Sequence, residues 1–516
     1  MKLKNTLIEG KFRISSMATI QVIAAVATIG YLINGFLYSG QELIDLHHFR
    51  QTQTALVTEG ILKSQGLFFL TNSVPVLGPP WEVPFDFPIY QFMVSLLSGI
   101  SGIGISQSGR LLNVLLGLAL VHPTHKIFKV TGVSSNASLF LVIITLTSSQ
   151  YLYWSRAFLI ENTALLLSLY GVYFSIKVIQ SYSLQNQFYS LVLFTLAAMQ
   201  KITTALPIIL ALIVLNFLHS SELKGFSKVK ELTKYAAPFV LPISISQVWV
   251  VYSDGIKEDG LLSKYMTSAS LSGWNFGTFA QRFSSDLWVD VILKRVVLGN
   301  SGAGIAFILL VIYLIKFPRN QKYIITFLLM FLLPILIFPN LHIVHTYYQS
   351  ANLLFLLMAI SIALEDLTKS KMKVAVTLLL ITSVVNLAVF SKYYLPFERL
   401  KKEDTIEYLI AQELKSVTSK QNIFVSYGLD WDPTVSYLSS RDAVMFPNWY
   451  PNYDRAIINP LYYSGKKKID AIILCQSSED NLRNIAFKLA ITASQLNLME
   501  IRKVRECTIY SGKNSG

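Results

Sequence analysis

Long apolar runs, separated by shorter polar stretches, fill most of the first three quarters of the chain. A helix rises about 1.5 Å per residue, so roughly 20 apolar residues cross a hydrocarbon core about 30 Å thick. By this measure the pattern predicts about eleven membrane-spanning helices. Their approximate centres are Ala27, Leu118, Val142, Leu167, Phe194, Leu212, Ile243, Leu309, Leu329, Leu356 and Leu380.

The apolar stretch of residues 87–105 differs from these runs because it contains Pro88, Gly99, Gly102 and Gly104. Proline and glycine interrupt or weaken the interior of a helix. We therefore expect this stretch to be an interfacial or re-entrant segment rather than a full crossing of the membrane.

The pattern changes at about residue 392, where the sequence becomes more polar. Residues 404–419 have apolar positions at helical spacing, and short strands are predicted at residues 422–427, 443–446, 470–475 and 506–510. Strands that alternate with helical stretches indicate a small α/β domain. The predicted organisation is an α-helical polytopic membrane domain over residues 1–391, followed by an α/β domain over residues 392–516. No glycine-rich phosphate loop follows the first predicted strand, which argues against a nucleotide site there.

Composition supports the membrane assignment, because hydrophobic residues make up 53% of the 516 residues and only 14% are charged. The formal net charge is +14, but many Lys and Arg residues lie in short loops between predicted spans, so no nucleic-acid partner is expected. Two cysteines, Cys475 and Cys507, allow one disulfide at most. The sequence has no CxxC or His/Cys spacing typical of a metal site.

The lysine-rich segments predict the orientation of the chain. They are the N-terminus, the loops near Lys126 and Lys129, and residues 224–234, 316–322 and 369–373. If residues 87–105 do not cross the membrane, counting from a cytoplasmic N-terminus places all of these segments in the cytoplasm. The apolar run of residues 17–38 is too long for a signal-peptide core and has no cleavage site, so we interpret it as an uncleaved first span. The C-terminal domain then lies outside the cytoplasm.

The first outward loop begins with QELIDLHHFRQTQTA, residues 41–55, which places many ionisable side chains directly after the first span. Polar groups beside a bilayer cost free energy unless water or partners satisfy them, so this cluster is a candidate functional site. If the stretch is helical, Asp45 and His48 share one face, whereas His47 and Arg50 share another. A carboxylate can accept a hydroxyl proton, and a guanidinium suits phosphate. The alternative is a solvated juxtamembrane helix.

A second block in the same loop is GPPWEVPFDFPIYQ, residues 78–91. Its prolines favour a rigid, extended path that carries Glu82 and Asp86, with Trp81 and Tyr90 nearby. The alternative interpretation is an interfacial loop with an aromatic anchor.

Three further outward segments carry polar groups. Arg156 and Glu161 flank the second outward loop, and their spacing does not pair them on one helix. Lys201 lies at a tight turn between two predicted spans. The fifth outward loop carries His342, His345, Tyr347, Tyr348 and Gln349. The alternatives are an ordinary interfacial ion pair, a snorkelling lysine and an aromatic belt, respectively.

These features together resemble the GT-C class of membrane glycosyltransferases, especially the branch of protein O-mannosyltransferases and lipid A aminoarabinose transferases. The resemblance covers roughly residues 15 to 390. It rests on the acidic-plus-Arg cluster after the first span and on a series of later motifs in the same order. These motifs are PFDFPIYQ, GRLLNVLLGLAL, WSRAFLIENTALLLSLYGVYF, MQKITTALPIIL and HTYYQSANLLFLL.

The resemblance implies a polyprenyl-phosphate-linked sugar donor and transfer of the sugar to a lipid, glycan or protein acceptor outside the cytoplasm. It also implies an acidic general base in the first loop. His47 and His48 stand where the family usually has an Asp-Glu pair. Asp45 is therefore the first candidate for the base, and Glu42 and Glu82 are the alternatives.

The resemblance matches the family's second-loop acid and arginine to Glu161 and Arg156. Donors of hydrogen bonds and positive charge stabilise the leaving phosphate as its bond breaks. The candidates for this role are Arg50, His47, His48, Arg156, Lys201, His345, Tyr347 and Tyr348. Members of the family vary in metal dependence, so no cofactor is assigned and a divalent metal stays open.

Other classes of function were weighed against this one. A transporter or lipid-linked sugar flippase usually has internal repeats and broken helices with a site near the midplane, and the sequence has neither. A polymerase or ligase of surface polysaccharide is chemically close to the first hypothesis. A non-catalytic scaffold would leave the one-sided polar cluster unexplained.

Overall fold

The computed structural model describes residues 2–64, 74–219, 237–316, 321–475 and 481–512. The chain divides into two compact units. The helical unit comprises Met1–Gly40, Gly109–Val248 and Ser272–Glu398, and the mixed unit comprises Gln41–Ser108, Trp249–Leu271 and Arg399–Gly516. The chain enters the mixed unit for the last time at Arg399, and the domain boundary at residue 392 stays a prediction. The mixed unit also takes in two earlier segments, which the sequence division left in the membrane domain.

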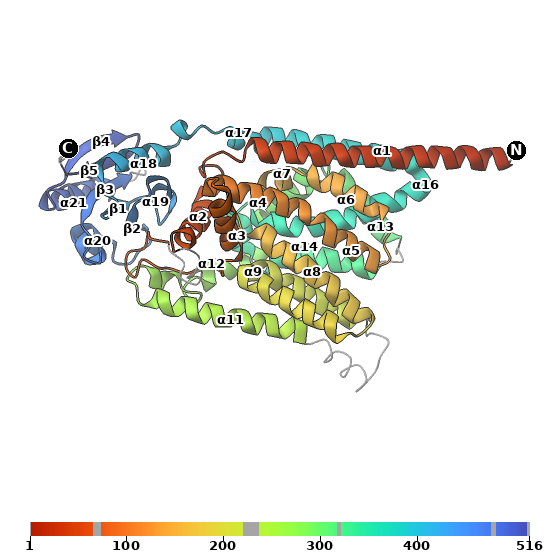
Figure 1. The fold of residues 1–516 in the computed structure, drawn as a ribbon, viewed down its shortest axis with the longest axis horizontal. Coiled ribbons are helices and arrows are strands. Elements are labelled where there is room, and N and C mark those ends of the chain that lie inside the picture. Colours follow the sequence, from red (N-terminus) through yellow and green to blue (C-terminus); the bar gives the residue numbers. More distant parts are fainter. Residues whose placement is uncertain (1, 65–73, 220–236, 317–320, 476–480, 513–516) are drawn as a thin grey trace. The chain divides into compact units, whose positions relative to one another are not determined.

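In the helical unit, α8 packs on α9, and α14 packs on both α9 and α16 (Figure 1). The helices that the structure describes here are α1 (Lys2–Leu37), α4 (Ile105–Ala119), α5 (Val121–Val130), α6 (Asn136–Leu146), α7 (Ser149–Trp154), α8 (Glu161–Gln180), α9 (Leu184–His219), α11 (Ala237–Glu258), α12 (Ser272–Phe276), η2 (Ala280–Phe283), η3 (Asp286–Leu298), α13 (Ile305–Ile315), α14 (Gln321–Ile337), α15 (Pro339–Val344), α16 (Tyr348–Tyr393) and α17 (Leu395–Glu398). Of these, α4 begins and α11 ends within the mixed unit.

Six described stretches of helix are long and apolar enough to cross a membrane: Met17–Leu37, Ile105–Val130, Glu161–Gln180, Leu184–His219, Pro238–Glu258 and Tyr348–Tyr393. Two of them, α9 and α16, are broken at Lys201 and Lys371, where the backbone is not helical. Each broken helix therefore contains two of the predicted span centres. The shorter apolar helices α6, α13 and α14 contain three more. All eleven predicted centres lie in apolar helices, and the number of crossings stays a prediction.

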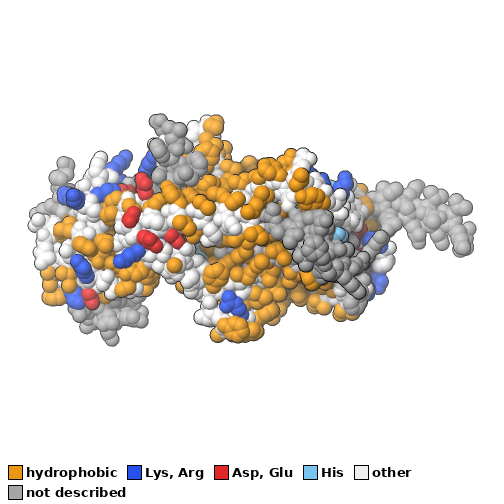
Figure 2. Space-filling model, turned by 90° about the horizontal axis from the view of Figure 1, so that it is seen from below, with side chains coloured by type: hydrophobic (Ala, Val, Ile, Leu, Met, Phe, Trp, Pro, Cys, Tyr) orange, Lys and Arg blue, Asp and Glu red, His pale blue; other side chains and the backbone are white. Residues whose placement is uncertain are grey.

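The outer faces of several long helices are apolar. Val22 and Val26 of α1 and Val248 and Val251 of α11 have 62–72% of their surface exposed. Figure 2 shows that hydrophobic side chains cover broad areas of the molecular surface. Large exposed apolar areas of this kind are typical of contact with lipid. The protein is a multi-pass membrane protein.

The mixed unit is built around a five-stranded sheet in the order β2-β1-β3-β5-β4. Strands β2, β1 and β3 are parallel, whereas β5 is antiparallel to both β3 and β4. A disulfide joins Cys475 of β3 to Cys507 of β5. The described elements are α2 (His48–Lys63), α3 (Ile89–Ser101), η1 (Ser263–Met266), η4 (Lys402–Asp404), α18 (Ile406–Val417), β1 (Ile423–Tyr427), α19 (Thr434–Ser439), β2 (Asp442–Phe446), α20 (Tyr453–Ile458), η5 (Pro460–Tyr463), β3 (Ile469–Cys475), α21 (Asn481–Gln495), β4 (Met499–Val504) and β5 (Cys507–Ser511).

The sheet also explains why the first outward loop is part of this unit. The backbone N–H groups of Ala443 and Met445 in β2 donate hydrogen bonds to the carbonyl oxygens of Pro75 and Val76, at 2.8 and 2.9 Å. Leu77 forms an antiparallel bridge with Val444. The first loop thus covers the open edge of β2, which would otherwise present unpaired backbone groups.

Helix α3 is the segment that we expected not to cross the membrane. It has 13 residues and is followed by Gly102, whose φ of 71° lies in the left-handed region that favours glycine. A helix of this length is about 20 Å long, which is shorter than a hydrocarbon core of about 30 Å. It belongs to the mixed unit.

Candidate active site

The cluster after the first span forms the start of α2. His47 adopts a left-handed conformation (φ 54°, ψ 38°), and the helix begins at His48. Asp45 therefore lies before the helix, and the expectation that it shares a helical face with His48 is wrong. Its side chain is buried, with 1% exposure, and its Oδ1 accepts a hydrogen bond of 2.7 Å from Nε2 of Gln51. Glu42 lies nearby in sequence and lines a polar cavity of about 370 Å³.

His48 contacts two carboxylates of the mixed unit. Its Nε2 lies 3.2 Å from Oδ2 of Asp432 and 3.9 Å from Oε1 of Glu407. Burial lowers the pKa of His48, but the hydrogen bond and charge of Asp432, together with the charge of Glu407, outweigh burial and raise the pKa to about 9. His48 is therefore protonated at neutral pH and forms an ion pair. Nothing in the local sequence pointed to these two partners.

Arg50 joins the two blocks of the first loop. Its Nη2 forms an ion pair with Oδ2 of Asp86, and its Nη1 donates a 2.7 Å hydrogen bond to Oε1 of Gln53. The side chains of Arg50 and Asp86 keep 19% and 25% exposure, so the pair remains accessible. Of the two acids in the proline-rich block, Asp86 contacts this cluster, whereas Glu82 is exposed. The guanidinium is thus oriented by a carboxylate, an arrangement suited to binding an anion in a fixed direction.

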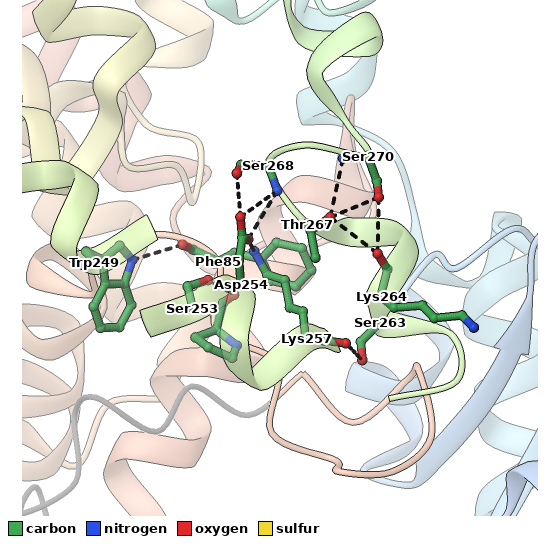
Figure 3. A network of polar contacts seen from close by, with 11 residues as sticks. Phe85, Trp249, Ser253, Asp254, Lys257, Ser263, Lys264, Thr267, Ser268 and Ser270 are labelled. Atoms are coloured by element: carbon green, nitrogen blue, oxygen red, sulfur yellow. Dashed lines mark hydrogen bonds and ion pairs between the residues drawn. The ribbon is translucent and has the colours of Figure 1, made fainter. Parts of the chain in front are cut away.

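A polar network holds the backbone just before Asp86 (Figure 3). The indole N–H of Trp249 donates to the carbonyl oxygen of Phe85 at 3.1 Å, and the hydroxyl of Ser253 donates to that of Pro84 at 2.7 Å. Lys257 lies 5.1 Å from the centre of the Phe85 ring. The sequence analysis missed these residues because they lie in a segment more than 150 positions later in the chain.

Asp254 ties this network together in the same view. It accepts hydrogen bonds from the backbone N–H and the hydroxyl of Ser268, and Nζ of Lys257 lies 3.2 Å from its Oδ1 (Figure 3). The segment from Trp249 to Ser268 is therefore folded against the proline-rich block by paired polar groups rather than by apolar packing alone.

In the helical unit, Glu161 and Lys201 form a buried ion pair. Glu161 is the first residue of α8, and Lys201 is the non-helical residue at which α9 breaks. The exposed fraction of both side chains is 5%. Nζ of Lys201 also lies 4.1 Å from the ring centre of Tyr348 and 5.1 Å from that of Tyr347. The predicted turn lysine is thus an internal cation with an acidic partner and two aromatic faces.

A small cavity adjoins this pair. It has a volume of about 10 Å³, and its lining includes Glu161, Lys201, His342, Tyr348 and Asn352. Within the described part of the chain, Oε2 of Glu161 and Oδ1 of Asn352 accept no hydrogen bond. A cavity of this size holds about one water molecule, and polar atoms without partners are the groups that such a water satisfies.

Arg156 does not pair with Glu161. Its Nε lies 2.5 Å from Oε1 of Glu398, and both side chains are buried, with at most 1% exposure. Asn34 donates a further hydrogen bond of 3.3 Å to Glu398. Glu398 was missed because the polar sequence around it, LPFERLKKED, indicated the start of the C-terminal domain.

The predicted fifth outward loop is mostly helical and internal. His342 is 1% exposed, and burial, with the charges of Lys201 and Arg295, lowers its pKa to about 3. His342 is therefore neutral at physiological pH. The side-chain amide of Gln349 donates to the carbonyl oxygens of His342 and His345, at 2.8 and 3.2 Å. Arg295, which the sequence analysis did not select, donates to the His342 carbonyl at 2.9 Å.

The predicted site residues thus fall into two groups, one within each unit. Asp45, His48, Arg50 and their partners belong to the mixed unit, whereas Arg156, Glu161, Lys201 and the residues from His342 to Gln349 belong to the helical unit. That the two groups form one site stays a prediction. Among the described residues, no three His, Cys, Asp or Glu side chains gather in a way that could hold a metal ion.

The fold is that of the GT-C class of membrane glycosyltransferases, as the resemblance implied. A family model described as dolichyl-phosphate-mannose-protein mannosyltransferase matches residues 82–249. This range contains residues 82–91 of the proline-rich block, Arg156, Glu161 and Lys201. A search of curated protein sequences found no match.

Solved structures resemble nearly the whole chain. ArnT from Cupriavidus metallidurans bound to undecaprenyl phosphate aligns with a TM-score of 0.65 and 12% identity, over 96% of this chain and 98% of ArnT. The apo oligosaccharyltransferase of Archaeoglobus fulgidus gives 0.53 and 11%, over 92% and 71% of the two chains. The arabinofuranosyltransferase AftD from Mycobacteria gives 0.55 and 11%, over 97% and 40%. At these identities the likeness establishes the fold alone.

Proposed function

We propose that this protein is a membrane glycosyltransferase that moves a sugar from a polyprenyl-phosphate-linked donor to an acceptor outside the cytoplasm. The observation that carries the proposal is the correspondence, over 96% of this chain and 98% of the other, with an ArnT structure that holds undecaprenyl phosphate. A transferase that uses such a donor needs a base for the acceptor and cationic groups for the leaving phosphate. Both kinds of group are present in the predicted outward segments.

In the proposed reaction, a carboxylate takes the proton of the acceptor hydroxyl or amide as its oxygen or nitrogen attacks the anomeric carbon. The bond from that carbon to the phosphate oxygen breaks, and its electron pair leaves with the polyprenyl phosphate. Asp45 is the proposed base, with Glu42, Glu82 and Glu161 as alternatives. Negative charge on the leaving phosphate is stabilised by cations fixed in advance, each contributing a few kcal/mol by analogy with oxyanion-hole donors.

Two cations fit this role best. Arg50 is oriented by Asp86 and keeps part of its surface exposed, so an incoming phosphate can reach its guanidinium. Lys201 is placed at a helix break, and its charge is already balanced by Glu161. The remaining candidates are proposed to assist in binding the phosphate. They are His47, His48, Arg156, His345, Tyr347 and Tyr348. The Arg156 side chain is only 1% exposed, and Nε2 of His48 already lies near two carboxylates, those of Asp432 and Glu407.

The proposed location is the cell membrane, with a cytoplasmic N-terminus and an extracytoplasmic C-terminus. The disulfide between Cys475 and Cys507 supports this orientation, because disulfides form and persist in oxidising compartments. The partners are the lipid-linked donor, the bilayer and a lipid, glycan or protein acceptor. Metal dependence is left open.

The test is transfer by the purified full chain. The protein is incubated in detergent with radiolabelled polyprenyl-phosphate sugars and a membrane extract as the source of acceptor, and labelled product is measured. Asp45→Asn, Glu82→Gln and Glu161→Gln are compared with Asp454→Asn, an exposed carboxylate of α20 that serves as the matched control. We expect Asp45→Asn to lower transfer by at least about 100-fold and the control to leave it unchanged. If no sugar is transferred, the function is wrong, and if all three variants transfer fully, the assigned base is wrong.

A further inference from the structure

The loop that follows β1 packs against the first outward loop, although no sequence motif in either loop indicated this contact. This Trp431 loop comprises residues 428–433, with the sequence GLDWDP. It leads into α19, where Oδ1 of Asp432 accepts hydrogen bonds from the backbone N–H and the hydroxyl of Thr434, at 2.9 and 2.5 Å. Gly428 has a φ of 90° and lies against the backbone of Cys475. The loop is therefore fixed at both of its ends within the α/β part of the mixed unit.

On one side, the loop contacts the first turn of α2. Asp432 forms the ion pair with His48, and the ring of Trp431 meets that of Phe49 edge to face, with centres 4.5 Å apart. One turn further, the hydroxyl of Thr52 lies 3.1 Å from that of Thr434. These contacts flank the position of Arg50 on the same helical turn, so they fix the axial position and the rotation of the helix that carries it.

On the other side, the loop contacts the proline-rich block. The rings of Trp431 and Phe85 are stacked, with centres 5.6 Å apart and planes 14° from parallel. Lys257 lies against the same Phe85 ring, and Trp249 bonds to the Phe85 carbonyl oxygen (Figure 3). Phe85 directly precedes Asp86, the partner of Arg50. The Trp431 indole thus contacts the residue before Arg50, which is Phe49, and the residue before Asp86, which is Phe85.

From these contacts we propose that the Trp431 loop is a positioning element, which holds Arg50 and Asp86 in the geometry needed to bind the donor phosphate. Trp431 acts on the pair through Phe49 and Phe85, whose rings it contacts. The inference rests on the proposed function. It assigns the C-terminal α/β domain a role in positioning Arg50 and Asp86 of the first outward loop. Displacing a positioned group by about 1 Å can cost about 100-fold in rate, so a loosened Arg50 would slow transfer.

The first test measures geometry without activity. Hydrogen exchange of the full chain in detergent is followed by mass spectrometry for wild type, Trp431→Ala and Tyr453→Ala. Tyr453 is the matched control, because it packs edge to face on Tyr427 of β1. We expect Trp431→Ala to speed exchange both in residues 45–53 and in residues 82–88, while Tyr453→Ala leaves both segments unchanged. Unchanged exchange in Trp431→Ala overturns the proposal.

The second test measures coupling to the ion pair. Trp431→Ala is expected to lower kcat for transfer by about tenfold or more, and Trp431→Phe, which keeps an aromatic plane, to restore most of it. In an Arg50→Gln background, Trp431→Ala should cause no further loss, because both changes remove the same oriented guanidinium. Additive losses would indicate a general structural effect and would overturn the positioning role.

The two tests separate this inference from the proposed function. If wild type transfers no sugar, the proposed function fails, and the exchange experiment still decides whether Trp431 fixes the two segments. If exchange rises in Trp431→Ala but transfer equals that of wild type, the loop is structural and its positioning role is wrong.

Discussion

At the scale of single residues, three cationic side chains of this chain are each paired with a carboxylate. Arg156 pairs with Glu398, Lys201 pairs with Glu161, and Arg50 pairs with Asp86. The first two pairs are fully enclosed, whereas the third remains partly exposed. A buried pair contributes little net stability, but removing one partner leaves a charge that burial penalises strongly. The partial exposure of Arg50 and Asp86 is what the proposed binding of the donor phosphate requires.

The buried pair of Glu161 and Lys201 allows structure and function to be separated. Lys201→Met leaves Glu161 uncompensated and is expected to destabilise the protein by about 3–5 kcal/mol. The double variant Glu161→Gln/Lys201→Met removes both charges, so its thermal midpoint in detergent should return close to that of wild type. If Lys201 binds the donor phosphate, the double variant stays inactive although it is folded. Recovery of transfer in the double variant would show that the pair serves stability alone.

The ion pair of His48 predicts a pH dependence of stability. The pKa of about 9 in the folded protein lies above the ordinary value of 6.5. Protonated His48 therefore stabilises the fold fully below about pH 6.5, and this contribution is lost as the pH rises through about 9. The difference in thermal midpoint between wild type and His48→Gln should shrink steadily between these two values. A difference that does not change from pH 6 to pH 10 would contradict the assignment of Asp432 and Glu407 as its partners.

At the scale of elements, breaks in regular structure place the polar groups. The break in α9 puts Lys201 inside the helical unit, and the left-handed residue His47 starts α2 just before Arg50. The turn after β1 depends on Gly428, whose φ of 90° few other residues adopt. Each of these departures from helix or strand geometry lies at or beside a residue of the proposed site or of the Trp431 loop.

Gly428 gives an element-scale prediction. A Cβ at this position would overlap the carbonyl oxygen of Cys475, so Gly428→Ala must displace the Trp431 loop from β3. We expect a lower thermal midpoint and a loss of transfer similar to that of Trp431→Ala. Gly255→Ala in α11 is the control, because nothing lies within 4 Å of the position that its methyl group would take and alanine favours a helix by about 1 kcal/mol. Equal behaviour of the two variants would refute the special role of Gly428.

At the scale of the whole molecule, three segments far apart in the sequence fold into one compact mixed unit. They are Gln41–Ser108, Trp249–Leu271 and Arg399–Gly516. If such a unit lies on one side of a membrane, the three segments share a side, as the proposed orientation requires. The positive-inside rule assigned the first loop, the fourth loop and the C-terminal domain to the same side from lysine positions alone. The orientation itself stays a prediction.

The proposed orientation can be tested by the protease accessibility of the two ends of the chain. An epitope fused to the C-terminus should be removed when protease is added to intact cells, whereas an epitope at the N-terminus should survive until the membrane is broken. The physical reason is that lysine-rich loops are retained in the cytoplasm and that the Cys475–Cys507 disulfide needs an oxidising compartment. Protection of the C-terminal epitope in intact cells would reverse the proposed orientation.

Much of the fold could be predicted because its signals are local. The predicted strands at residues 422–427, 443–446, 470–475 and 506–510 match β1, β2, β3 and β5 within a residue at each end. Strand β4 was missed because all but the last of its residues are exposed, and the apolar alternation of its sequence, MEIRKV, stops after four residues at Lys503. Its place in the sheet is set by pairing with β5.

The sequence by itself determined the apolar helices, the α/β domain, the candidate charges and the side of the membrane to which each loop was assigned. These follow from hydrophobic length and lysine position, which each segment carries alone. Only the tertiary structure decided the partner of each charge: Arg156 pairs with a residue 242 positions away, and Lys201 with one 40 positions away. Pairing depends on burial and on distances of a few ångströms between segments, and no local pattern encodes these quantities.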